Sequence, residues 1–165
     1  GGGGIMEERL YFAYGSNINL KQMKHRCPNA KVVGPVTLDG YRLTFRGSGV
    51  ATILPCEGRK VEGLLWKLTP ACERALDYYE GYPHLYHKED IVVRDKENRE
   101  ITTMVYVMDS KYEKQPSLPR EGYFKGIYDG YMQNKIETDS LFGALKETWA
   151  EVVQMKKARQ KGKER

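Results

Sequence analysis

A glycine turn with polar neighbours is the first feature of this sequence that could do chemistry. Tyr14-Gly15-Ser16-Asn17 follows an aromatic-rich segment and precedes a short helical pattern. Gly15 lets the backbone turn sharply and approach a ligand closely, and free N–H groups at a helix start favour negative charge. The turn therefore suits a carboxylate or a developing oxyanion. The same residues are also typical of a simple capped strand-to-helix turn.

A second candidate is Glu80, the last residue of a predicted helix. Thr69-Pro70 predicts the start of this helix, and Gly81 predicts its end. A carboxylate at a helix C-terminus faces the negative end of the dipole, and burial there would push its pKa upward. Such a glutamate can act as a general base and then as a general acid. The alternative is a solvated glutamate at a frayed helix end.

Tyrosines form a third, more scattered group, with twelve in the chain. Such residues could line a polar small-molecule pocket, because a phenol ring combines an apolar face with a hydroxyl. The candidates are Tyr11, Tyr14, Tyr41, Tyr86, Tyr106, Tyr112, Tyr123, Tyr128 and Tyr131. Each could equally be a half-buried core residue with a satisfied hydroxyl. The pair His84 and His87 lacks the cysteine or acidic partners of a metal site, so no metal is expected.

The elements that must position these residues are mostly strands. Alternating apolar and aromatic runs predict strands over residues 9–14, 31–38, 41–46, 50–54, 61–68, 86–94 and 100–108. Asp39-Gly40 predicts a hairpin between the second and third of these. Helices are predicted over residues 19–26, 70–80, 122–135 and 139–156, with Ser16 or Asn17 capping the first. This order favours an α+β fold, a small mixed and mostly antiparallel β-barrel flanked by helices.

The charge distribution separates a tail from the body of the chain. The 165 residues carry a net charge of +5, and the last ten, residues 156–165, account for all of it. Residues 6–155 are expected to form one domain, residues 156–165 a disordered basic tail, and residues 1–5 to be an expression remnant. The neutral body lacks the basic stripe of a nucleic-acid-binding protein.

Hydropathy and cysteine usage restrict the location. No apolar run approaches the roughly 18 residues of a membrane span, so no membrane partner is expected. The three cysteines, Cys27, Cys56 and Cys72, are odd in number and widely separated. This pattern is typical of reduced thiols and predicts a cytoplasmic protein.

Taken together, these motifs resemble the γ-glutamylcyclotransferase family, with its AIG2-like and BtrG-like members. The matching segments are LYFAYGSN at residues 10–17, GLLWK at 63–67, LDYYEG at 76–81 and PSLPREGYFKGI at 116–127. They occur in the family's order. YGSN followed by LDxxEG is more specific than either motif alone.

The resemblance implies a cofactor-free enzyme with a small barrel and a cavity at the YGSN turn. The α-amine of a γ-glutamyl compound would attack its own γ-carbonyl and release 5-oxoproline and a free amino acid or amine. Glu80 matches the family's catalytic glutamate. The implied substrate-binding residues are Tyr11, Phe12, Ala13, Tyr14, Gly15, Ser16, Asn17, Tyr86, Tyr106 and Tyr123. The resemblance also implies a homodimer. The sequence departs from the family in one place, since the stretch from Gly81 to Tyr86 is about one residue shorter than in the mammalian enzyme.

Several alternatives remain open from the sequence. The substrate could be a γ-glutamylamine or a γ-glutamylated metabolite precursor instead of a dipeptide. The amides of the Gly15–Asn17 turn could hold either the oxyanion or the substrate α-carboxylate. A module that binds small acidic metabolites without turnover would keep the turn but not need Glu80. An interaction protein would act through its basic tail.

Overall fold

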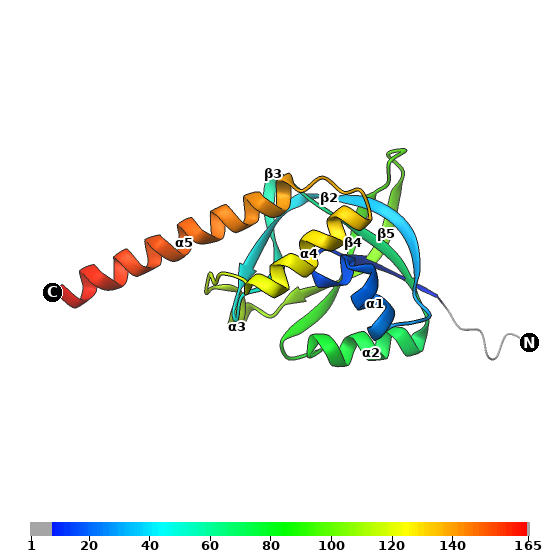
Figure 1. The fold of residues 1–165 in the computed structure, drawn as a ribbon, viewed down its shortest axis with the longest axis horizontal. Helices are drawn as coiled ribbons and strands as arrows, with labels where there is room; N and C mark the ends of the chain where they lie inside the picture. Colours follow the sequence, from blue (N-terminus) through cyan, green and yellow to red (C-terminus); the bar gives the residue numbers. More distant parts are fainter. Residues whose placement is uncertain (1–7, 165) are drawn as a thin grey trace, which may run out of the picture.

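Five strands close into a barrel in the computed structural model, which describes residues 8–164. The strands are β1 (Arg9–Ala13), β2 (Lys31–Arg46), β3 (Val50–Leu68), β4 (Tyr86–Arg94) and β5 (Glu100–Met108), joined in the closed order β1-β3-β2-β4-β5 (Figure 1). Every neighbouring pair is antiparallel except β1 and β5, which are parallel. The predicted α+β fold with a mixed, mostly antiparallel barrel is confirmed. The predicted remnant at residues 1–5 lies outside the described residues.

The predicted hairpin at Asp39-Gly40 is wrong, because both flanking segments belong to the single long strand β2. The register with β3 shifts between Asp39 and Tyr41, and Gly40 has a φ of 82°. Asp-Gly supplies a left-handed residue that serves a β-bulge as well as a turn. Here it bends a continuous strand around the barrel. The predicted strands over 50–54 and 61–68 likewise merge into β3.

The barrel interior is filled with apolar side chains. Phe12, Phe45, Leu64 and Met104 have 0%, 0%, 0% and 1% of their surface exposed, and full burial of such a side chain contributes about 1.5–3 kcal/mol. Gly63 is required between β1 and β3, since a Cβ there would lie 2.4 Å from the carbonyl oxygen of Ala13. The strands that carry the candidate tyrosines are therefore held by a tightly packed core.

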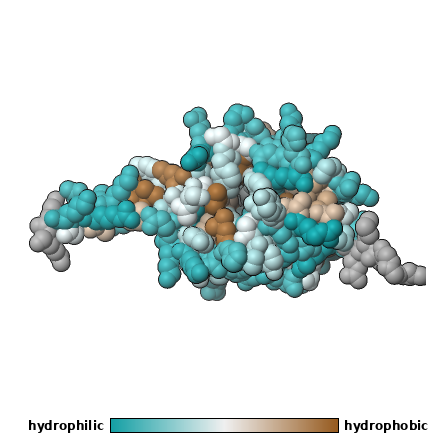
Figure 2. Space-filling model, turned by 90° about the horizontal axis from the view of Figure 1, so that it is seen from below, coloured by the Kyte–Doolittle hydropathy of each residue, from teal (hydrophilic) through white to brown (hydrophobic). Residues whose placement is uncertain are grey.

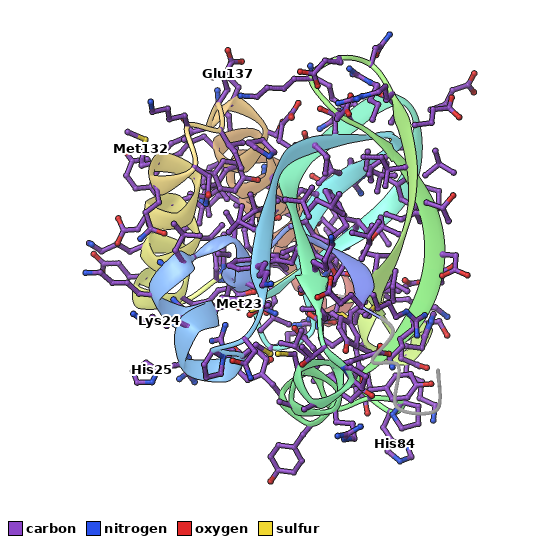
Figure 3. The ribbon with its side chains drawn as sticks, turned by 90° about the vertical axis from the view of Figure 1, so that its right-hand side faces the viewer. Met23, Lys24, His25, His84, Met132 and Glu137 are labelled. Carbon is purple, nitrogen blue, oxygen red and sulfur yellow. The ribbon has the colours of Figure 1, made fainter. Side chains whose placement is uncertain are left out.

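Shorter helices connect the strands of the barrel or follow them. They are the 3-10 helix η2 (Ser16–Ile18), α1 (Leu20–Arg26), α2 (Pro70–Glu80), α3 (Ser110–Glu113) and α4 (Glu121–Gln133). Asn19, not Ser16 or Asn17, caps α1, and its side chain accepts a hydrogen bond from the Gln22 N–H at 3.0 Å. Met23 of α1 points inward, whereas Lys24 and His25 point into solvent (Figure 3).

The last helix, α5 (Asp139–Glu164), packs on the barrel only with its first half and then extends away from it (Figure 1). Leu141, Ala144 and Thr148 are buried against the barrel, and Arg46 bonds Glu151 at 2.7 Å. The tail predicted to be disordered continues this helix to Glu164, because Lys, Arg, Gln and Ala are good helix formers.

The surface of α5 changes character along its length. Figure 2 shows hydrophobic areas where α5 leaves the body and a hydrophilic surface toward its far end. Phe142 and Trp149 near the root are 46% and 58% exposed. None of the helices within residues 8–164 is both long and apolar enough to cross a lipid bilayer.

Candidate active site

Helix α2 places Glu80 at one end of the barrel. The Thr69 side chain accepts a hydrogen bond from the Cys72 N–H at 3.2 Å and starts the helix. Gly81 ends it in the left-handed conformation, with a φ of 68°, while the Tyr82 N–H donates to the Asp77 carbonyl at 2.9 Å. These caps fix Glu80 as the last helical residue, so local sequence determines where the helix ends.

The turn between β1 and η2 faces Glu80 from the opposite side. The Trp66 indole Nε1 donates to the carbonyl of Asn17 at 3.0 Å and anchors the turn to β3. A Cβ at Gly15 would lie 3.2 Å from the Cβ of Ala51, so a side chain there would press on the opposite wall. The turn thus combines a close backbone approach with helix-start N–H groups that lack intrahelical acceptors.

Asn17 joins the turn directly to Glu80. Its side-chain Nδ2 donates to Glu80 Oε1 at 3.3 Å and to the Tyr11 hydroxyl at 2.9 Å. Its Oδ1 accepts a hydrogen bond from Arg26 Nη1 at 2.5 Å. Residues separated by 63 positions in the chain therefore share one hydrogen-bonded network.

A cavity of about 220 Å³ opens at this network. It brings together most of the predicted site residues, and its full lining is Tyr11, Tyr14, Gly15, Ser16, Asn17, Val50, Ala51, Tyr79, Glu80, Leu85, Tyr86, Tyr106 and Tyr123. Phe12 and Ala13 are not among the lining residues and are buried in the core, with 0% and 1% of their surface exposed.

Burial dominates the electrostatics of the cavity. It raises the pKa of Glu80 from 4.5 to about 7, and the nearby Arg26 charge opposes this shift. Burial also raises the pKa values of Tyr11, Tyr14, Tyr86 and Tyr123. At neutral pH the cavity therefore holds one carboxyl poised between its two forms, surrounded by neutral phenols.

The phenols differ in what their hydroxyl protons do. Tyr14 donates to the Tyr106 carbonyl at 2.6 Å, Tyr86 to the Ala51 carbonyl at 2.7 Å, and Tyr106 to Asp77 at 2.6 Å. The hydroxyls of Tyr11 and Tyr123 instead accept hydrogen bonds, from Asn17 Nδ2 and from the Ala51 N–H. The hydroxyl groups of Tyr11 and Tyr123 can therefore still donate a hydrogen bond to another acceptor.

Sequence reasoning missed part of the site. Val50, Ala51, Tyr79 and Leu85 line the cavity, and Arg26 supports it from α1. One signal pointed to Tyr79, since it directly precedes Glu80 at the end of α2. Nothing in the spacing of Arg26 shows that α1 brings it to Asn17.

Comparisons with known proteins show the family to which the chain is related. Residues 11–126 match the family model described as "Gamma-glutamyl cyclotransferase, AIG2-like". The chain is 33% identical over 139 residues to the gamma-glutamylcyclotransferase of Homo sapiens, covering 78% of this chain and 72% of the relative. It is 32% identical to the Bos taurus protein of the same name, with the same coverage.

Solved structures of other proteins have a similar fold. A structure titled "Gamma-glutamyl cyclotransferase" superimposes with a TM-score of 0.72 at 32% identity, covering 78% of this chain and 81% of the other. YkqA from Bacillus subtilis shares the fold, with a TM-score of 0.71 at 20% identity, covering 86% of this chain and 54% of the other.

Proposed function

This chain belongs to the gamma-glutamyl cyclotransferase, AIG2-like family and has the cyclotransferase function of that family, and we propose that Glu80 is the general base and acid of its reaction. The observation that carries this proposal is the carboxyl of Glu80 in the cavity, whose pKa burial raises to about 7. A group with a pKa near the working pH accepts and returns a proton most effectively.

The reaction needs proton transfer and folding of the substrate rather than a covalent enzyme nucleophile. The α-amine attacks the γ-carbonyl carbon, a new C–N bond closes the five-membered ring, and the bond to the leaving nitrogen breaks. Over the whole reaction the attacking nitrogen loses two protons and the leaving nitrogen gains two. Glu80 takes a proton from the α-ammonium group and returns one to the departing amine. Holding amine and carbonyl together supplies several kcal/mol of barrier reduction.

Neutral donors surround the place where negative charge develops. The N–H groups of the Gly15–Asn17 turn and the hydroxyl protons of Tyr11 and Tyr123 are donors for the substrate α-carboxylate and the oxyanion of the tetrahedral intermediate. Donors already fixed in a cavity need no reorganisation as the charge forms. We propose a γ-glutamyl dipeptide or amine as the substrate, bound without a metal or cofactor.

The test is an assay of 5-oxoproline release. Purified protein is incubated with γ-glutamyl dipeptides and with ε-(γ-glutamyl)-lysine, which separates dipeptide from amine substrates. Glu80→Gln is expected to lower kcat by about 10²–10⁴-fold, whereas Glu89→Gln, an exposed carboxyl on β4, leaves it unchanged. Full activity in Glu80→Gln would show that Glu80 is not the base. Tight substrate binding with no product in the unaltered protein would instead indicate a non-catalytic binding module.

The location and assembly of the protein are further proposals. Cys27, Cys56 and Cys72 are all free thiols, which supports a reducing compartment such as the cytoplasm. The homodimer implied by the family resemblance stays a prediction, and sedimentation of the purified protein tests it.

A further inference from the structure

Arg26 is the best-connected side chain beside the cavity, although it does not line it. From the end of α1 its Nη1 donates to Asn17 Oδ1 at 2.5 Å and to Ser16 Oγ at 3.4 Å, and its Nη2 donates to Gln22 Oε1 at 2.9 Å and to the Tyr79 hydroxyl at 2.7 Å. The guanidinium also lies over the Tyr79 ring, with 3.8 Å from Cζ to the ring centroid. A planar guanidinium presents several donors in fixed directions and can bind these four partners at once, whereas the ammonium group of a lysine cannot.

The guanidinium determines which end of the Asn17 amide faces Glu80. Arginine has donors and no acceptor, so the atom of Asn17 that meets Arg26 must be the acceptor Oδ1. The NH2 group, which can only donate, is then turned to Glu80 and to the Tyr11 hydroxyl. A donor beside a carboxyl favours its ionised form, whereas an amide oxygen in the same place would favour the protonated form.

We propose that Arg26 is a positioning residue that acts through Asn17, locking the amide so that its NH2 group faces Glu80 and keeps that carboxyl ready to accept a proton. The inference rests on the proposed role of Glu80 as the base. It assigns to α1 a part in the chemistry although Arg26 touches neither substrate nor reacting atoms.

Among the groups around Glu80, Arg26 carries the charge that acts most strongly on the Glu80 carboxyl. Tyr11 and Tyr14 face it from β1 and the turn that follows, Tyr86 from β4 and Tyr123 from α4, and all are neutral phenols at neutral pH. Asp77, one turn earlier on α2, is paired with Lys88 at 2.9 Å. Within residues 8–164, Arg26 is the only group whose charge lowers the pKa of Glu80.

The test compares Arg26→Met, which keeps the side-chain length but removes charge and donors, with Arg26→Lys, which keeps only the charge. We expect the midpoint of the acid limb of kcat/KM to rise by about one pH unit in Arg26→Met, so that activity falls about fivefold at neutral pH and much less at about pH 9. Arg26→Lys should shift the midpoint less but lower kcat, because one ammonium cannot orient the amide and Tyr79 together. Arg42→Met, which removes an equal charge that is paired with Glu147 of α5 and does not line the cavity, should leave the midpoint in place.

A second measurement follows the protonation of Glu80 without depending on enzyme turnover. The carboxyl of Glu80 is titrated by carbon NMR, assigned with Glu80→Gln, in the unaltered protein and in both Arg26 variants. A folded Arg26→Met with an unchanged Glu80 midpoint overturns the proposal. If Arg26→Met does not fold, an unchanged midpoint together with full kcat in Arg26→Lys overturns it instead. These failures differ from failure of the proposed function, in which Glu80→Gln itself stays active.

Discussion

Burial of the Glu80 carboxyl has a cost that depends on pH. The pKa of this group is about 7 in the folded protein against an ordinary value of 4.5. Between these two values the folded state holds a proton that the unfolded state has released, so the free energy of unfolding falls as pH rises through this window. Below it, both states are protonated and the cost disappears. The feature that makes Glu80 a useful base therefore destabilises the fold at neutral and alkaline pH.

Replacing Glu80 with Gln should remove this pH-dependent cost. Relative to the unaltered protein, Glu80→Gln is expected to gain roughly 1–3 kcal/mol of stability at pH 8 compared with pH 5, while its cyclotransferase activity falls. The neutral amide keeps an oxygen that can accept the hydrogen bond from Asn17. Urea unfolding of both proteins at the two pH values measures the difference. Two unfolding curves that move in parallel with pH would show that the carboxyl is not buried.

The two ends of this network differ in how far sequence could predict them. Glu80 is predictable because Thr69, Pro70 and Gly81 fix both ends of α2, and a glutamate before such a stop is electrostatically unusual. Arg26 is not, since it lies at an ordinary helix C-terminus, where a cation is favoured anyway. Arg26 points toward Asn17 only because α1 packs beside the turn that contains Asn17.

At the scale of elements, the end of α2 is the part of the fold whose geometry the site needs most. Gly81→Ala places a Cβ 3.1 Å from the Cβ of Leu85, a cavity residue, at a φ of 68°. We expect it to cost about 1 kcal/mol of stability and to lower kcat/KM about tenfold, because small displacements of a catalytic group are costly.

Gly58 provides a matched control for this substitution. It has a φ of 81°, and a Cβ there meets nothing within 4 Å. Gly58→Ala should lose about as much stability as Gly81→Ala but keep its kcat/KM. Thermal unfolding and the 5-oxoproline assay are run on both variants. Equal loss of activity in the two would mean that general destabilisation, not the position of Glu80, limits turnover.

Local signals predicted helices and strands well but failed where the barrel overrides them. The strands β4 and β5 and helix α2 have their predicted bounds. At Asp39-Gly40 the left-handed backbone of the glycine was predictable, but the predicted chain reversal does not occur, because β2 continues through it. In this barrel β2 and β3 are long, paired strands of 16 and 19 residues, and their continuous pairing makes the glycine part of a bulge rather than a turn.

At the scale of the whole molecule, barrel closure is what assembles the site. Cavity residues come from β1, the turn that leads into η2, η2 itself, the start of β3, α2, β4, β5 and α4, so no local pattern could place them together. Alternation along β1 also explains why Phe12, a predicted site residue, does not line the cavity. Tyr11 faces the cavity, whereas its neighbour Phe12 packs in the core against Gly63. Motif matching takes the whole segment 11–17, whereas the cavity is lined by Tyr11 and by residues 14–17.

The far half of α5 lies outside this assembly, which leads to a prediction for the whole chain. Its side chains from Lys156 to Lys163 are exposed, and its root is held by Leu141, Ala144 and Thr148. A chain that ends at Met155 should therefore keep its kcat/KM within about twofold and its free energy of unfolding within about 0.5 kcal/mol. A full-length variant with Lys156, Lys157, Lys161 and Lys163 changed to Gln separates the effect of charge from that of helix length. Loss of turnover in the shortened chain would mean that the basic segment takes part in function, as an interaction protein acting through its tail would require.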